Sequence, residues 1–361
     1  MKKFFALLLA LTMVLSLAAC GAKEETPAEK PAEGTEAPAE TPADALPGEG
    51  MEIALVAPKI GTQVFLLQMV DALNDAAEKY GFKATVVECA DTAAFEENIR
   101  ALVAEECDLI IGGGWEAGDA LNKMATEFPD GSNYALIDSE VEAENVKCIS
   151  YYEQQGAYLI GMIAGLVTDG ESHVYGSVHV NEGAGSWKWR YGYMEGVKAI
   201  DPEAEFIFNY TASYSDPAKA KELSIQHFEQ GAVFVNSAAA AGDSGTFEAA
   251  AEKGFFTSGQ DVDLTDPNNP QIVSSQIKDT YQSVTILIDE FFSDNYNNEN
   301  STWGVAEGTI GAVHVTHESV NPIHERLSEE DIALLKQAAE DLRTGKLDLI
   351  NMPTEEEYNA G

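Results

Sequence analysis

The sequence predicts an α/β protein with two doubly wound parallel-sheet lobes joined by a multi-strand hinge, preceded by a signal peptide and a disordered tether. Short apolar runs alternate with segments of helical periodicity, which is typical of parallel sheets covered by helices on both faces. The segment after the tether, residues 51–361, is long for one hydrophobic core and suits two lobes.

The first residues predict export. Lys2 and Lys3 precede an apolar run over 4–17, and small residues lead to Cys20. This is the pattern of a signal peptide, here residues 1–19, and the run is shorter than a membrane-spanning helix needs. The sequence LAACG also resembles a bacterial lipobox, in which the cysteine is lipidated and becomes the new N-terminus. An ordinary signal peptide that contains a cysteine is the alternative. We expect an extracytoplasmic chain anchored to the cell membrane by lipidated Cys20.

Residues 20–50 predict a disordered acidic tether. They consist mainly of Pro, Ala, Glu and Thr, with almost no large apolar side chain. Such a segment cannot bury enough surface to offset the entropy of ordering it, and its prolines and like charges keep it extended.

The first lobe is predicted from a β-α alternation that starts at residue 51. Leucine, methionine and valine recur at helical spacing over 66–80, and Gly81 ends that helix. The predicted strands of this lobe are 51–57, 84–87, 109–111 and 134–137, and its helices are 66–80, 94–105 and 117–127.

A second alternation begins near residue 153. Its predicted helices are 153–167, 191–200, 217–230 and 246–252, and its strands are 174–180, 205–210, 233–235 and 255–256. A helix over 280–292, a strand over 311–315 and an amphipathic helix over 329–344 follow. We assign 51–148 plus 277–305 to lobe 1 and 149–276 plus 306–350 to lobe 2. Parallel sheets bind ligands at the carboxyl ends of their strands, so a cleft between two such edges is the expected site.

Composition and isolated motifs exclude several functions. The formal net charge is −40, which argues against nucleic acid as a partner. The three cysteines after Cys20 lie in apolar runs and are expected to be buried thiols, with one disulfide among them as the alternative. A glycine run without a following Lys-Ser/Thr does not predict a phosphate loop. The first two of the three C-terminal histidines are three apart on a strand-like run and so point to opposite faces, which argues against a metal site. No G-x-S-x-G elbow appears, and no cofactor or catalytic residue is predicted. The cysteines are Cys89, Cys107 and Cys148, the glycine run is Gly112, Gly113 and Gly114, and the histidines are His314, His317 and His324.

Four segments resemble, in order and spacing, the basic membrane protein family of ABC-importer substrate-binding lipoproteins, which includes bacterial purine nucleoside receptors. The segments are YYEQQGAYLIGMIAGLVT, GYMEGVKAIDP, YSDPAKAKELSIQHFEQGA, and SGQDVD followed by SSQIKD. The resemblance runs from residue 51 to the last helix. It implies a type I periplasmic binding protein fold, with a nucleoside held in the cleft between aromatic rings and charged groups.

The resemblance assigns three charged residues to the site. Asp261 matches the family's ribose-binding aspartate, Lys278 matches its lysine, and Asp138 matches its aspartate at the mouth of the cleft. A carboxylate can accept two hydrogen bonds from vicinal hydroxyls. The structural alternatives are a turn aspartate for Asp261, a solvated helix cap for Lys278 and an Asx cap for Asp138.

Aromatic residues complete the predicted site. Trp115, Trp189 and Tyr214 fall where the family places rings near the ligand, and Trp187 competes with Trp189. Core packing is the alternative for each. Phe65 takes the place of the phenylalanine in the family's Asp-Gly-Ser-Phe-Asn segment. Thr62 and Leu66 replace the Asp and Asn of that segment, so the hydrogen bonds that read the purine there are missing and the ligand's identity stays open.

The implied function is the substrate-binding lipoprotein of a bacterial ABC importer. We expect a monomer, without enzymatic activity, that captures a nucleoside-like or other ring-bearing polar solute and delivers it to ABC permease and ATPase subunits. The alternatives are a lipid-anchored surface hydrolase and a ligand sensor on a similar α/β frame. The sequence does not separate transport from sensing.

Overall fold

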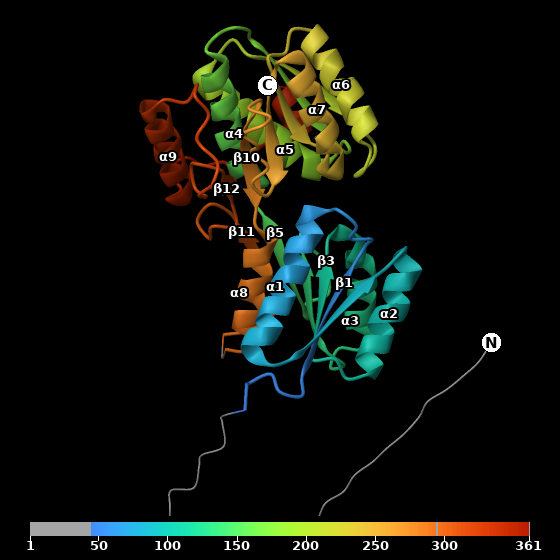
Figure 1. Ribbon diagram of the computed structural model, residues 1–361. Helices are drawn as coiled ribbons and strands as arrows, with labels where there is room; N and C mark the ends of the chain where they lie inside the picture. The colour runs from blue at the N-terminus through green and yellow to red at the C-terminus, as the bar shows by residue number, and fades with distance from the viewer. Residues whose placement is uncertain (1–44, 294, 361) are drawn as a thin grey trace, which may run out of the picture. The chain divides into compact units, whose positions relative to one another are not determined.

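The computed structural model describes residues 45–293 and 295–360 (Figure 1). The predicted signal peptide, the lipidation site Cys20 and the tether as far as residue 44 lie outside the described residues. Residues 47–50 form a turn, and the backbone N–H of Gly48 donates to the carbonyl of Tyr80 at 2.8 Å. None of the helices in the described residues has both the length and the apolarity needed to span a bilayer.

One six-stranded sheet, sheet A, has the order β11-β5-β4-β3-β1-β2, and every neighbouring pair in it is parallel. Its strands, in chain order, are β1 (Glu52–Ala57), β2 (Lys83–Glu88), β3 (Leu109–Gly113), β4 (Asn133–Ile137), β5 (Val146–Tyr151) and β11 (Ser301–Trp303). Helices α1 (Val64–Tyr80), α2 (Thr92–Ala104), α3 (Gly118–Glu127) and α8 (Thr280–Phe291) pack against it.

The side chains of β1 show why both faces of sheet A are covered. Ile53 and Leu55 belong to the core shared with α1 and α8, whereas Ala54 and Val56 belong to the core shared with α2 and α3. Successive side chains of a strand point to opposite faces, so a strand that is apolar throughout needs helices on both. All four residues are buried.

The second sheet, sheet B, has the order β12-β10-β9-β8-β6-β7. Its strands are β6 (Val174–His179), β7 (Glu205–Tyr210), β8 (Phe234–Ala238), β9 (Phe256–Asp261), β10 (Ile272–Lys278) and β12 (Ile310–Ala312). The edge strand β12 is antiparallel to β10, and the other pairs are parallel. The prediction of two doubly wound sheets is therefore confirmed, with one antiparallel edge added.

Helices also cover both faces of sheet B. Side chains of α4 and α5 share a core with Tyr175 and Phe234, and those of α6 and α7 share one with Val178 and Val235. The helices of this part of the chain are α4 (Glu153–Thr168), α5 (Ala184–Ile200), α6 (Pro217–Glu229), α7 (Asp243–Lys253), α9 (Glu329–Arg343) and α10 (Glu355–Ala360). Of these, α9 packs on α4.

Glycines allow α4 and α5 to approach closely. A Cβ atom at Gly196 would lie 2.0 Å from the carbonyl oxygen of Tyr158, and one at Gly192 would lie 2.2 Å from that of Gln154. Both distances are far below van der Waals contact, so only glycine fits at these two positions. The contact fixes the position of α5, whose first turns carry Trp187 and Trp189.

The chain passes between the sheets at three places. It leaves β5 of sheet A for α4, leaves β10 of sheet B for α8, and leaves β11 of sheet A for β12. These crossings correspond to the predicted multi-strand hinge. They also show that sheet A receives its last strand, β11, only after the chain has completed most of sheet B.

Several element boundaries differ from the sequence prediction. The predicted strand over 311–315 stops at Ala312, because the chain turns back and Thr316 Oγ1 accepts from the Ala312 N–H at 2.9 Å. Helix α5 begins at residue 184 rather than 191. Strands β5, β10 and β11 and helix α10 were not predicted. The prediction of buried thiols is confirmed, since Cys89, Cys107 and Cys148 are buried and free.

Candidate functional site

A cavity of about 600 Å³ lies where loops and strand ends of sheet A meet those of sheet B. Residues from both sheets line it, and they include every residue that the sequence assigned to ligand binding. These are Phe65, Trp115, Asp138, Trp189, Tyr214, Asp261 and Lys278. The cavity therefore gathers residues that are up to 213 positions apart, from 65 to 278, into one site.

The charged residues come from the carboxyl ends of strands. Asp138 directly follows β4, Asp261 is the last residue of β9, and Lys278 is the last residue of β10. Both aspartates have positive φ, 73° for Asp138 and 68° for Asp261. Aspartate adopts this left-handed conformation more readily than most residues. The backbone thus turns sharply where each carboxylate meets the cavity.

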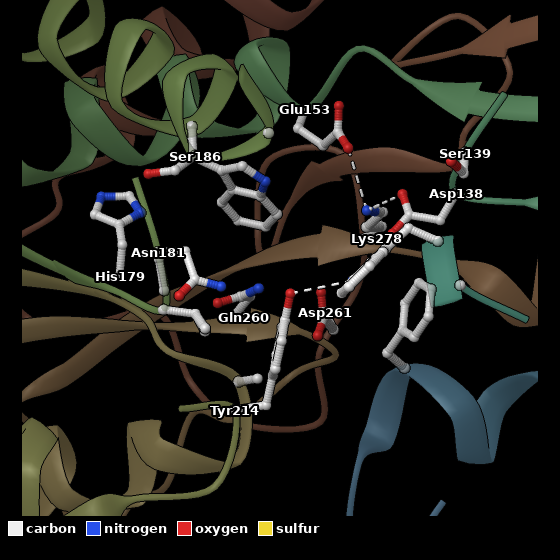
Figure 2. Close-up of a pocket in the computed structure, with 18 of the residues that line it drawn as sticks. Asp138, Ser139, Glu153, His179, Asn181, Ser186, Tyr214, Gln260, Asp261 and Lys278 are labelled. Atoms are coloured by element: carbon white, nitrogen blue, oxygen red, sulfur yellow. Dashed lines mark hydrogen bonds and ion pairs between the residues drawn. The ribbon is translucent and has the colours of Figure 1, made fainter. Parts of the chain in front are cut away.

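Lys278 is the centre of a buried ion cluster (Figure 2). Its Nζ atom pairs with the carboxylate of Asp138 and with Oε1 of Glu153, the latter at 3.2 Å. Glu153 Oε2 lies 3.2 Å from Nζ of Lys188, which also donates to the carbonyl of Tyr151 at 2.9 Å. The cluster links the end of sheet A, the start of α4 and the end of sheet B.

Burial and pairing act against each other in this cluster. Burial by itself would lower the pKa of Lys278, but the carboxylates of Asp138 and Glu153 outweigh it and raise that pKa. Burial would likewise raise the pKa of Glu153, yet Lys278 and Lys188 outweigh it and hold the pKa below its ordinary value. The Lys278–Glu153 pair is therefore ionised, with each charge compensated by its partner.

The pKa of Asp261 shifts in the opposite direction to that of Glu153, because burial outweighs the attraction of nearby cations. Its carboxyl group is buried, and this raises its pKa to about 6, against an opposing attraction from Lys278. Near neutral pH the group is an anion in a poorly solvated position. A carboxylate held in this way accepts hydrogen bonds from ligand hydroxyls more strongly than one in water.

Aromatic rings approach the cavity from both sheets. Trp115 follows β3 of sheet A and Tyr214 follows β7 of sheet B, and the Trp115 indole N–H donates to the Tyr214 hydroxyl at 3.3 Å. The two residues are nevertheless 58% and 40% exposed. Phe65 lies with its ring centroid 5.4 Å from Nζ of Lys278. Large exposed rings around a cavity suit a flat ring system of a ligand.

The structure separates the two competing tryptophans. Trp189 lines the cavity. Trp187 instead donates from Nε1 to the carbonyl of Pro353 at 2.8 Å and packs edge-on against Tyr358, with ring centroids 5.3 Å apart. Trp187 therefore anchors the C-terminal helix α10 to α5.

The loop after β1 offers few polar groups to the cavity. Leu66 is buried and lines the cavity, whereas Thr62 is exposed and does not. Gln63 lines the cavity, but its side-chain amide donates to the carbonyl of Lys59 at 2.7 Å.

Sequence reasoning missed several cavity-lining residues, both charged and neutral. The charged ones are Glu116, Glu153, Glu182 and Lys188. Glu153 was predicted only as the start of a helix, because strand β5, which brings it to the cavity, was not recognised. The neutral polar residues lie at strand ends of sheet B, in the loop after β6 or in the first turn of α5, and carry no distinctive motif. They are His179, Asn181, Ser186 and Gln260.

Within residues 45–293 and 295–360, no group of three or more His, Cys, Asp or Glu side chains is arranged to hold a metal ion. Two of the three histidines near the C-terminus have other partners. His317 Nε2 lies 3.1 Å from the carbonyl of Gly308, and the ring of His324 packs edge-on against Phe256.

The two sheets and the cavity between their strand ends define a two-lobed α/β protein built to hold a small molecule. The chain belongs to the PnrA-like ABC transporter substrate-binding protein family, Bmp, whose family model matches residues 53–342. This agrees with the family resemblance found in the sequence.

Individual relatives are distant. The chain is 26% identical over 162 residues to the CD4+ T-cell-stimulating antigen of Listeria innocua, covering 45% of this chain and 44% of that one. It is 27% identical over 244 residues to basic membrane protein A2 of Borrelia garinii, covering 63% and 69% of the two chains. The fold is similar to that of an ABC transporter solute-binding protein from Aeropyrum pernix, with a TM-score of 0.73, 20% identity, and 86% and 96% coverage.

Proposed function

We propose that this protein is the extracytoplasmic, lipid-anchored binding subunit of an ABC importer, and that it captures a nucleoside-like solute for a membrane permease without altering it chemically. The anchor rests on the sequence around Cys20. The ligand class rests on one observation. A single cavity joins a buried carboxylate, Asp261, and an ion-paired lysine, Lys278, to several aromatic rings.

The chemistry of this combination favours a sugar joined to a flat ring. The Asp261 carboxylate can accept hydrogen bonds from two vicinal hydroxyls, and Lys278 can donate to a ring or hydroxyl oxygen. Trp115, Tyr214 and Phe65 offer faces and edges for stacking. A free sugar would cover fewer of these rings than a nucleoside does, and a free base would leave Asp261 without vicinal hydroxyls.

The same cavity explains how binding would change the protein. Trp115 and Asp138 belong to the part built on sheet A, whereas Tyr214 and Asp261 belong to the part built on sheet B. A ligand that touches both parts binds the arrangement with the two close together better than one with them apart. Binding therefore shifts the population toward the closed arrangement, which is the form offered to a permease.

A ligand screen tests the proposal. The full-length mature protein is melted in the presence of nucleosides, nucleobases, pentoses and amino acids, each at a concentration well above micromolar. A ligand at 100 times its Kd stabilises the native state by about 2.7 kcal/mol, so at least one nucleoside is expected to raise Tm by several degrees. If only sugars or only amino acids raise Tm, the nucleoside assignment is wrong.

A further inference from the structure

The cavity is lined by more carboxylates than cations. Five acidic side chains and two lysines line it. Lys278 pairs with Asp138 and Glu153, and Lys188 pairs with Glu153, so two of the carboxylates already engage both lysines. Among the described residues, the other three carboxylates form no ion pair, and the cavity therefore has an excess of negative charge. These three are Glu116, Glu182 and Asp261.

Glu116 places one of these charges among aromatic rings. It follows Trp115 directly in the short 3₁₀ turn after β3. A Cβ atom built at Gly114 would lie 3.0 Å from Oε2 of Glu116 and 3.9 Å from Cε1 of Phe65, so this carboxylate and the phenyl ring border the same small space. Burial raises the pKa of Tyr214, and the nearby Glu116 adds to the rise. A carboxylate without an ion pair thus lies close to three rings that line the cavity.

The charges of Glu116 and Asp261 lack compensation in the ligand-free protein. Glu116 is half-buried, and burial raises the pKa of its carboxyl group, with a further rise caused by Asp138. Asp261 is buried, and burial raises its pKa to about 6 against the attraction of Lys278. A raised pKa means that the surroundings disfavour the charged form. A positive charge bound nearby would favour it again.

Glu182 extends the excess charge to the part built on sheet B. It is exposed and belongs to the loop after β6. Arg190 lies near it but does not line the cavity, and both terminal nitrogens of Arg190 donate to the carboxylate of Glu355, at 2.5 and 2.6 Å. Because Glu116 comes from the sheet A part, carboxylates without an ion pair reach the cavity from both sheets.

Carboxylates and ring faces attract the same kind of ligand group. A cation near the face of an aromatic ring is attracted by the ring's quadrupole, and more strongly where water is excluded. Lys278 lies 5.4 Å from the centroid of the Phe65 ring, but its charge is offset by Asp138 and Glu153. A neutral ligand would leave the excess negative charge of the cavity as it is, and an anion would add to it.

We propose that the solute carries a positive charge on its flat ring, and that this charge is held between the aromatic rings and Glu116. The inference rests on the proposed nucleoside-binding function and specifies the charge of the base. A riboside with a pyridinium or N-alkylated ring matches the cavity better than a neutral riboside of the same size.

Titration calorimetry of the full-length mature protein with two matched ribosides tests the inference. Nicotinamide riboside has a permanently charged pyridinium ring. Its dihydro form keeps the ribose and the carboxamide, differs by one added hydride, and is neutral. Wild-type protein is expected to bind the cation about tenfold more tightly, because only the cation compensates the excess charge.

Glu116→Gln keeps the side-chain size and removes the charge, so it is expected to reduce the ratio of the two affinities about fivefold. Asp119→Asn is the matched control. Asp119 is exposed in the first turn of α3, three residues after Glu116, and does not line the cavity. This control should leave the ratio unchanged.

Glu182→Gln keeps the test decisive if Glu116→Gln does not fold, because Glu182 is exposed. It is expected to reduce the ratio in the same direction but by less. If the neutral riboside binds wild type as tightly as the cation, or if neither variant changes the ratio, the inference is overturned while the proposed function stands. If neither riboside binds and no nucleoside of the ligand screen raises Tm, the proposed function fails and the inference with it.

Discussion

Replacing Asp261 with asparagine should stabilise the ligand-free protein at neutral pH while weakening its binding. Asparagine has nearly the same shape, accepts the left-handed backbone at this position (φ 68°), and cannot ionise. The variant therefore removes the buried charge with little change in packing.

The size of the effect follows from the pKa. Burial raises the pKa of Asp261 from its ordinary 3.8 to about 6, and one pKa unit corresponds to about 1.4 kcal/mol. Ionised Asp261 therefore costs the native state about 3 kcal/mol, a figure that already includes its attraction to Lys278. Below pH 3.8 the carboxyl group is protonated in both the folded and the unfolded chain, so this cost is absent. As pH rises toward 6 the unfolded chain loses its proton first, and stability falls until the full cost is reached above pH 6.

Urea denaturation at pH 7 and pH 4 measures the difference. Asp261→Asn is expected to raise the free energy of unfolding by up to about 3 kcal/mol at pH 7 and by much less at pH 4. Calorimetry on the same protein should show ligand binding weaker by about 1 to 3 kcal/mol, because one strong acceptor is lost.

Asp169→Asn is the matched control, since Asp169 also has positive φ (46°) but is exposed at the end of α4. It should change neither stability nor binding appreciably. An Asp261→Asn variant that is less stable than wild type at pH 7, or equally stabilised at both pH values, would refute the argument from burial.

Two other changes have clear expected outcomes. Lys278→Met leaves the carboxylates of Asp138 and Glu153 without their shared cation and should destabilise the protein by about 3 to 5 kcal/mol in urea denaturation. Lys79→Met, which breaks an exposed pair with Asp289, should have a far smaller effect on stability; similar losses in both variants would show that the cluster adds little. Cys20→Ser should move the protein from the membrane fraction to the soluble fraction after cell lysis, as immunoblotting would reveal, and full retention in the membrane would contradict the lipid anchor.

The sequence predicted the strands whose apolar pattern is continuous and missed those whose buried side chains are polar. β1 reads as an apolar run and is easily recognised. β10 carries Ser274, Ser275 and Gln276, all buried, and these are acceptable inside the protein only because distant groups pair with them. For example, Ser274 Oγ donates to the carbonyl of Val313 at 3.0 Å. No local pattern reports partners 39 residues away.

The site residues were predictable to the extent that they end recognisable strands or match family motifs. Asp138 met both conditions. Asp261 was found through its family motif alone, because the strand predicted before it covered only residues 255–256. Glu153 lies in a family segment but received no role, because its place in the cavity depends on β5 and on the ion pair with Lys278. The choice between Trp187 and Trp189 depended on where α5 begins. Residues two apart on a helix point in widely different directions, and with α5 starting at residue 184 only Trp189 reaches the cavity.

The ion cluster sits at the points where the backbone changes sheets. Glu153 opens α4 two residues after β5 ends, and Lys278 closes β10 two residues before α8 begins. The charged side chains that face the cavity thus belong to the short segments that connect the two sheets. A change in how these side chains pair acts directly on the backbone that joins one half of the protein to the other.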